Sequence, residues 1–198
     1  LMPQGFDRSA LPDTMSAVQL TGHGGFECLR HVSDLPVPRA GAGEVLVRVR
    51  AAAVNNTDLN LRSGWYSKST ADDPAERSTD AGWGGEAVRL PLIQGADGCG
   101  QVVALGAGVE ATLLGRRVLL DPIIRRSHAG GTKYEYLGTD RDGCFAEYVV
   151  VPAANAVPVQ SEWSDAELAS FPCSYLAAEN MLERAGVGAA DTVLVSGA

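Results

Sequence analysis

The chain between Met15 and Pro158 consists of short apolar runs separated by glycine and proline, a pattern that leaves little room for long helices. In Glu44–Arg50, valine alternates with other residues, so the three valines would share one face of a strand. Leu46 would lie on the opposite face with two arginines. Many short strands with turn residues between them favour a mainly β fold, a small and partly open barrel. We expect further strands at Gln101–Leu105, Arg117–Leu120 and Ala146–Val151.

Helical signals lie toward the end of the chain. Ser164 and Glu167 have the spacing of a capping box, in which each side chain satisfies a backbone N–H of the first turn, so a short helix should begin there. A second helix is predicted over Ser174–Arg184, with Gly186 as its C-terminal stop. Apolar residues 192–195 then predict a buried strand that runs into Ser-Gly-Ala, as at the start of a nucleotide-binding βαβ unit.

Charge and hydropathy exclude several kinds of partner. Sixteen basic against 24 acidic residues give a net charge of −8, which repels phosphate backbones and anionic membrane surfaces. The apolar runs are much shorter than the roughly 20 residues that cross a bilayer. Residues 1–14 lack the basic and apolar parts of a secretory signal, and we interpret them as a leader or a cloning remnant. We expect no nucleic-acid partner, no membrane partner and a cytoplasmic location.

The cysteines and histidines show no metal-binding spacing. No Cys-x-x-Cys pair occurs, so neither a four-thiolate zinc site nor a dense disulfide framework is indicated. The three histidines lie in polar or glycine-rich surroundings. We expect reduced, mostly buried thiols, with Cys99 in the core. The segment 66–86, polar and rich in glycine, predicts a long surface loop.

Four segments, in consistent order along the chain, resemble parts of a known family. They are Ala51–Tyr66, which ends in Arg-Ser-Gly-Trp-Tyr, the glycine-rich Gly95–Val109, the segment Asp142–Tyr148, and Asp191–Ala198. Together they resemble the medium-chain dehydrogenase/reductase superfamily and, within it, the zinc-independent quinone oxidoreductase branch. The resemblance implies a GroES-like catalytic domain over residues 15–160. Residues 161–198 would then be connecting helices and the first strand of a truncated α/β Rossmann domain.

The resemblance also bears on zinc. Zinc-dependent members hold the catalytic metal with a Cys, a His and a later Cys, and leave one position for the alcohol or carbonyl oxygen. At the corresponding places this chain has Asn55, Ala96 and Cys173. One thiolate cannot hold zinc, and Ala96 has no ligand atom. The four clustered cysteines of a structural zinc lobe are also missing before Asp142. We expect no metal site.

What the resemblance implies is hydride transfer from NADPH, or NADH, to a quinone or an α,β-unsaturated carbonyl in the full-length protein. Asn55 would lie beside the nicotinamide, and Tyr66 at the mouth of the substrate pocket as a proton or oxyanion donor. Thr57 would occupy the position of a hydroxyl that relays protons. Further cofactor contacts would come from Asn56, Cys173, Ala177, Ser196, Gly197 and Ala198. We expect the chain to be inactive alone, since hydride donation needs a cofactor held between two domains.

Structural explanations remain open for several of these residues. Asn55 and Asn56 can also be explained by the capping of a helix over residues 57–62, because asparagine is a favoured N-cap. Thr57 then lies in the first turn of that helix. Asp58 and Arg62 are spaced as an exposed i,i+4 ion pair that would stabilise the helix. Cys173 can be a small buried hydrophobic residue.

Two other functions also remain open. A GroES-like domain can be a non-catalytic binding or assembly module, because function does not follow from fold. An alcohol dehydrogenase with atypical metal ligation is the third alternative. For the full-length enzyme we expect a small-molecule substrate and a homodimer.

Overall fold

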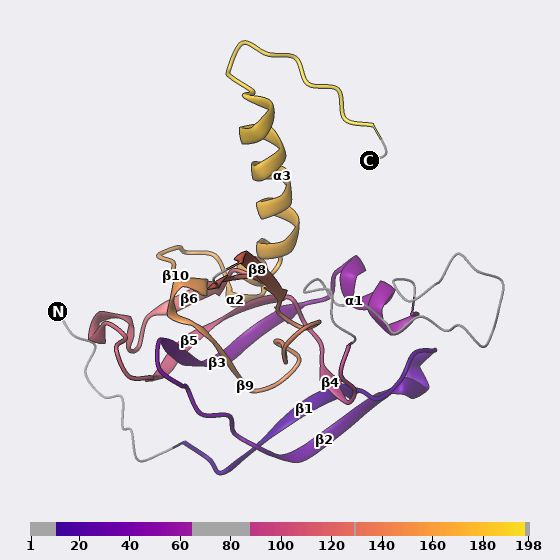
Figure 1. Cartoon of the computed structure of the whole chain (residues 1–198), viewed down its shortest axis with the longest axis vertical. Helices are drawn as coiled ribbons and strands as arrows, with labels where there is room; N and C mark the ends of the chain where they lie inside the picture. The colour runs from indigo at the N-terminus through magenta and orange to yellow at the C-terminus, as the bar shows by residue number, and fades with distance from the viewer. Residues whose placement is uncertain (1–10, 65–87, 129, 197–198) are drawn as a thin grey trace.

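The computed structural model describes residues 11–64, 88–128 and 130–196, and its largest unit is a five-stranded antiparallel sheet in the order β10-β6-β5-β3-β9 (Figure 1). Its strands are β3 (Glu44–Ala53), β5 (Asp97–Leu105), β6 (Arg117–Leu120), β9 (Tyr148–Pro152) and β10 (Ala156–Pro158). Val47 of β3 lies opposite Val102 on one side and Val149 on the other. The four strands predicted from the sequence are confirmed, and so is the mainly β, partly open barrel.

Two smaller sheets complete the β-structure. The first has the order β2-β1-β4, with β1 (Thr14–Leu20), β2 (Leu29–Pro36) and β4 (Leu92–Ile93). An isolated bridge between Ala17 and Ala146 joins it to the segment before β9. The second is the hairpin of β7 (Ile123–His128) and β8 (Gly131–Tyr136). Short 3₁₀ helices are η2 (Phe26–Cys28), η3 (Ala111–Leu113) and η4 (Ala153–Asn155).

Strand β3 is covered on both faces, which corrects one prediction. Val45 and Val47 lie in the main core cluster, as the alternation predicts. Leu46, expected to share an exposed face with two arginines, is instead buried in a second cluster with Met15 and Ile93. Alternation reports the two faces of a strand but not that a second layer can cover part of the polar face. Arg48 and Arg50 further along β3 are exposed, as expected.

A third core cluster attaches helix α1 (Asn56–Arg62) to the smaller sheet. Leu61 of α1 packs against Leu20 of β1 and Leu92 of β4, and Val88 lies partly buried against them. The three leucines are buried, so this contact removes a substantial apolar area from water. It fixes the helix that carries the first candidate site residues.

Helix α2 (Asp165–Ala169) begins as predicted. Ser164 Oγ accepts a hydrogen bond from the Glu167 N–H (3.2 Å), and Glu167 Oε2 accepts one from the Ser164 N–H (2.8 Å). Leu168 and Ala169 pack against buried Cys99, which confirms the core role predicted for that cysteine. Arg117 Nε donates to Asp165 Oδ1 (2.7 Å), and this ion pair ties the helix to β6.

Helix α3 (Pro172–Ala185) stands away from the sheets (Figure 1). It begins two residues earlier than predicted, with proline at its first position, where no intrahelical N–H is needed. Gly186 ends it as predicted, with φ of 65° in the left-handed region. No helix in the described ranges is long and apolar enough to span a membrane.

The strand predicted over residues 192–195 is not formed in this structure. Leu194 is 92% exposed, and no described strand pairs with this segment. An apolar sequence becomes a strand only where a neighbouring strand supplies partners for its backbone groups.

Candidate functional site

A buried carboxylate fixes the first turn of α1. Asn55 is the N-cap, and its backbone N–H donates to Asp58 Oδ2 (2.9 Å). Asp58 Oδ1 accepts a hydrogen bond from the Gly95 N–H (3.0 Å), and Gln94 Nε2 donates to the Asp58 carbonyl oxygen (3.0 Å). Of the two asparagines predicted to cap the helix, Asn55 is the N-cap, whereas Asn56 is the first helical residue, one position earlier than predicted. These bonds attach the helix start to the turn before β5.

The exposed ion pair predicted between Asp58 and Arg62 is wrong. Asp58 is only 6% exposed and bonds backbone N–H groups, whereas Arg62 Nη1 donates to the Gly24 carbonyl oxygen (2.6 Å). The Arg62 guanidinium also lies 4.9 Å from the centre of the Phe26 ring. The spacing permits the pair, but a surface pair of this kind is worth only roughly 0.2 to 0.5 kcal/mol. Tertiary hydrogen bonds to the carboxylate outweigh it.

Asp97, at the first position of β5, joins two of the predicted site residues. Its Oδ1 accepts a hydrogen bond from the Cys173 N–H (2.6 Å), and its Oδ2 accepts one from Asn55 Nδ2 (3.2 Å). Cys173 is the second residue of α3, so the carboxylate caps that helix from another element and interacts favourably with its dipole. Asn55 Nδ2 also lies 3.3 Å from Ser174 Oγ. The starts of α1 and α3 therefore meet at one carboxylate.

The two carboxyl groups at this point titrate above their ordinary range. Burial raises the pKa of Asp97, and the hydrogen bonds from Cys173 and Asn55 oppose that rise. Burial also raises the pKa of Asp58, and the nearby charge of Asp97 raises it further. The site thus carries an acidic pair in place of a cationic centre.

A tyrosine that the sequence analysis did not single out completes the cluster. Tyr136, the last residue of β8, is buried, and its hydroxyl lies 3.0 Å from Cys173 Sγ. Burial raises the pKa of Tyr136, and the contact with Cys173 contributes to that rise. Burial likewise raises the pKa of Cys173, so both groups are protonated at neutral pH. The pairing of β7 with β8 brings Tyr136 to this place. The residues next to Tyr136 in the sequence do not indicate that it lies beside Cys173.

Thr57 faces the same thiol. Its hydroxyl oxygen is buried and has no hydrogen-bond partner within ordinary distance in the described part of the chain. It nevertheless lies close enough to Cys173 to lower the pKa of that thiol in part. A buried hydroxyl without a close partner costs roughly 1 to 3 kcal/mol, and a bound ligand or water can supply the missing hydrogen bond.

The other predicted site residues divide into two groups. Asn56 is exposed on the first turn of α1, and Ala177 is exposed on α3 one turn after Cys173. Ser196 is exposed in the extended segment after α3. Tyr66, Gly197 and Ala198, and the loop predicted over 66–86, lie outside the described residues. The structure therefore brings together Asn55, Thr57 and Cys173, and adds Asp58, Asp97 and Tyr136.

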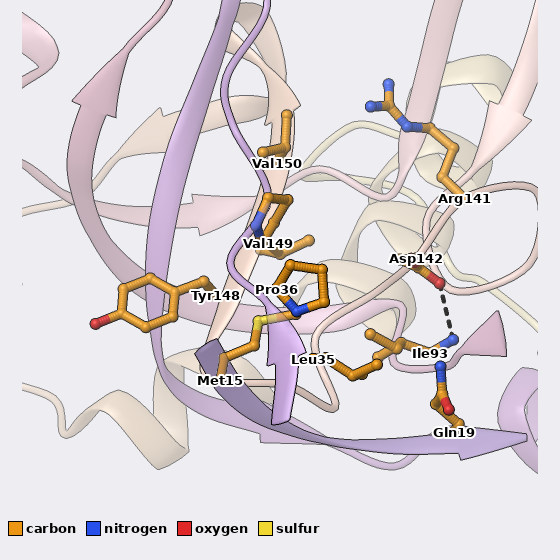
Figure 2. A pocket seen from close by; sticks show the side chains of 11 residues that line it. Met15, Gln19, Leu35, Pro36, Ile93, Arg141, Asp142, Tyr148, Val149 and Val150 are labelled. Atoms are coloured by element: carbon orange, nitrogen blue, oxygen red, sulfur yellow. Dashed lines mark hydrogen bonds between the residues drawn. The ribbon is translucent and has the colours of Figure 1, made fainter. Parts of the chain in front are cut away.

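A separate cavity of about 360 Å³ lies between β1, β2 and β9 (Figure 2). Its lining is mostly apolar, with Met15 and Ile93 among the residues shown. The Asp142 carboxylate on its wall accepts a hydrogen bond from the Ile93 N–H (2.9 Å), and Arg141 Nη2 donates to Glu44 Oε1 (3.0 Å). These charged groups hold strands together, and the cavity contains no member of the Asp97 cluster.

Comparison with known proteins identifies the family. A model described as the alcohol dehydrogenase GroES-like domain matches residues 41–161. The chain belongs to this family. It is therefore a member of the medium-chain dehydrogenase/reductase superfamily, as the sequence predicts.

Individual relatives are of more than one kind. A crystal structure of a candidate alcohol dehydrogenase from Sinorhizobium meliloti is 46% identical, with a TM-score of 0.79, and covers 95% of this chain and 52% of its own. The NAD-dependent alcohol dehydrogenase of Sulfolobus acidocaldarius is 30% identical over 84% of this chain and 47% of its own length. The structure of the quinone oxidoreductase from Coxiella burnetii is 26% identical, with a TM-score of 0.65, and covers 90% of this chain and 47% of its own. The chain spans about half the length of the curated relatives it matches.

The donor set of the GroES-like domain does not fit a catalytic zinc ion. Of the three positions implied by the resemblance, Ala96 offers a buried methyl group and Asn55 has its amide nitrogen bonded to Asp97. That leaves one thiol, whereas a catalytic zinc ion requires three protein ligands. Among the described residues no group of three Cys, His, Asp or Glu is arranged to hold a metal. That the protein works without zinc stays a prediction.

The cluster does fit a nicotinamide. The unpartnered Thr57 hydroxyl, together with the side chain of Asn55, could bind its carboxamide or the oxygen of a substrate beside it.

Proposed function

We propose that the intact protein is an NAD(P)H-dependent reductase of quinones or α,β-unsaturated carbonyls that acts without zinc. The observation that carries the proposal is the hydrogen-bonded cluster of Asn55, Asp97 and Cys173, with the methyl group of Ala96 beside Asp97. An amide and a methyl group occupy two of the three positions at which zinc-dependent relatives need metal ligands. Membership of an oxidoreductase superfamily and the likeness to a quinone oxidoreductase structure support it.

The chemistry of the cluster suits a conjugated acceptor. A bound nicotinamide supplies the hydride, which carries an electron pair to a ring carbon or to the β-carbon of an enone. The negative charge then moves through the conjugated system to the oxygen, where hydrogen-bond donors can stabilise it. A simple ketone concentrates that charge on one oxygen at once and needs stronger polarisation, as from a metal. Because Asn55, Ala96 and Cys173 do not fit a metal ion, a conjugated acceptor suits this cluster better than a simple ketone.

Particular residues take particular roles in this proposal. Asn55 and Thr57 orient the nicotinamide and the substrate oxygen, and Asp97 holds Asn55 and the start of α3 in place. Tyr66 is the proposed donor at the mouth of the pocket. The second domain binds the rest of the cofactor, with Ser196, Gly197 and Ala198 at its beginning. NADPH is the proposed donor, and the intact protein is proposed to be a cytoplasmic homodimer.

The test uses the whole protein, which we propose to carry this domain together with a nucleotide-binding half. We expect it to oxidise NADPH in the presence of a quinone or an enone and to retain that rate after exhaustive dialysis against a chelator. Tyr66→Phe should lose most of the rate, whereas Tyr134→Phe, on the exposed part of the β7–β8 hairpin, should not. Zinc at one equivalent per chain after dialysis, or no turnover with any conjugated acceptor, would refute the proposal.

The names of several relatives favour a second candidate, an alcohol dehydrogenase. The alcohol dehydrogenase would be favoured if the whole protein reduced NAD⁺ with simple alcohols at a higher rate than it oxidised NADPH with quinones. The third alternative, a binding or assembly module, would be supported if the whole protein bound neither nucleotide.

A further inference from the structure

The Tyr136 hydroxyl lies beside the thiol on which the cluster converges, and the sequence gives no role to it. Its oxygen is 3.0 Å from Cys173 Sγ, and Cys173 is bound through its N–H to Asp97. We propose that Tyr136 is a catalytic residue that donates a hydrogen bond to the substrate oxygen as negative charge develops there, an inference that rests on the reductase function proposed above.

The phenol is held in place before a substrate arrives. The Tyr136 N–H donates to Asp140 Oδ2 (2.7 Å), and its carbonyl oxygen accepts from the N–H groups of Thr139 and Asp140 (3.2 and 2.9 Å). The next residue, Leu137, is fully buried in the main core. A donor fixed in this way loses little entropy when it binds a ligand, and preorganised donors are the ones that lower reaction barriers most.

Its present partner can be exchanged for a stronger one. A thiol is a weak hydrogen-bond donor and a weak acceptor, whereas the oxygen of an enolate or of a hydroquinone anion is a charged acceptor. When the thiol donates to the phenol oxygen, the phenol proton can turn to the substrate. This exchange requires rotation of one hydroxyl group and no movement of the backbone.

The groups around the phenol favour donation over ionisation. Burial raises the pKa of Tyr136, and the hydrogen bond to Cys173 raises it further. Asp97 and Asp58 add to the rise, because their carboxylates would repel a phenolate. The phenol therefore keeps its proton through the hydride step. When hydride adds to the β-carbon, the C=C π pair becomes the new double bond of the enolate and the carbonyl π pair moves to the oxygen. That oxygen accepts the Tyr136 hydrogen bond. The final proton comes from solvent.

The first experiment measures the contact itself in the whole protein without cofactor. Alkylation of Cys173 by iodoacetamide is followed by peptide mapping as a function of pH in the parent, in Tyr136→Phe and in Tyr134→Phe. The phenol contact lowers the pKa of Cys173 against the rise that burial causes, so its removal should shift the pH of half-maximal alkylation upward. Tyr134 is 49% exposed on the same hairpin, so the control variant Tyr134→Phe should leave the pH of half-maximal alkylation unchanged. An unshifted pH in Tyr136→Phe would overturn the inference.

The second experiment measures turnover of a quinone or an enone by the same three proteins. Loss of one preorganised donor should lower kcat by about 100-fold. The KM for NADPH should remain within about threefold of the parent value, because the phenol is proposed to touch the substrate and not the cofactor. Suppose that the parent is active, and that Tyr136→Phe shifts the pH of half-maximal alkylation of Cys173 but keeps full kcat. In that case Tyr136 only positions Cys173, and the inference fails while the proposed function stands. If the parent itself reduces no conjugated acceptor, both fail together.

Discussion

Replacement of Asp97 should loosen the junction between α1 and α3. Asp97→Ala removes the acceptor of the Cys173 N–H and of Asn55 Nδ2, and it leaves a buried N–H at the start of a helix without a partner. An unpaired buried donor costs roughly 1 to 3 kcal/mol, and a lost anion at a partly buried helix N-terminus roughly 0.3 to 2 kcal/mol. Part of this is offset, because the variant no longer buries a carboxyl group whose pKa is raised. We expect a net loss of about 2 kcal/mol in the free energy of unfolding.

The assay is urea unfolding of the 198-residue chain, with Asp34→Ala as the matched control. Asp34 lies exposed on β2, and its replacement should change the free energy of unfolding by no more than about 0.5 kcal/mol. Asp97→Asn keeps one acceptor for the Cys173 N–H but turns an NH₂ group toward Asn55. Its loss in the free energy of unfolding should therefore be smaller than that of Asp97→Ala and larger than that of Asp34→Ala. If the free energy of unfolding of Asp97→Ala lies within about 0.5 kcal/mol of the parent value, the carboxylate does not stabilise the junction and the reasoning is refuted.

Three further predictions concern the scaffold and its titration. Gly100→Ala places a methyl group against the Arg48 carbonyl oxygen of the neighbouring strand, so it should destabilise the chain by about 1 to 3 kcal/mol in urea, and wild-type stability would disprove the close approach. Ser164→Ala removes the α2 cap and should cost about 1 kcal/mol, with Ser161→Ala as a comparison in the same loop. The raised pKa values of Asp58 and Asp97 mean that the folded state binds protons more tightly, so their contribution to stability falls as pH rises from the ordinary value of 3.8 through the raised values. Relative to the parent, Asp58→Asn should therefore gain stability with increasing pH over this interval, and a flat difference would contradict the burial argument.

Local patterns in the sequence were sufficient where local physics decides the structure. The capping box at Ser164, the helix stop at Gly186 and the capping of α1 by Asn55 each depend on residues within one turn, and each is confirmed. The strands of the barrel follow from short apolar runs between turn residues. The fold class and the superfamily could be predicted from the sequence, whereas the zinc-independent branch within the superfamily stays a prediction.

Tertiary contacts decided the rest. Asp58 looked like half of a surface pair, because spacing along a helix says nothing of the Gly95 N–H that binds its carboxylate. Leu46 looked exposed because the second layer over β3 comes from β1 and β4, far away in the chain. Tyr136 could not be singled out, since its place beside Cys173 depends on a hairpin and on the direction of α3. Residues 192–195 need strand partners that the described chain does not contain.

The attachment of α1 by Leu61 and of the segment before β4 by Val88 has a consequence for divergence within the family. Both residues pack into one apolar cluster, so the two ends of the stretch that joins them are fixed independently of its length. The entropy of closing a flexible connection grows slowly, by only about 0.6 kcal/mol for each doubling. Evolution can therefore lengthen or rewrite the sequence between these two residues at almost no cost to the barrel.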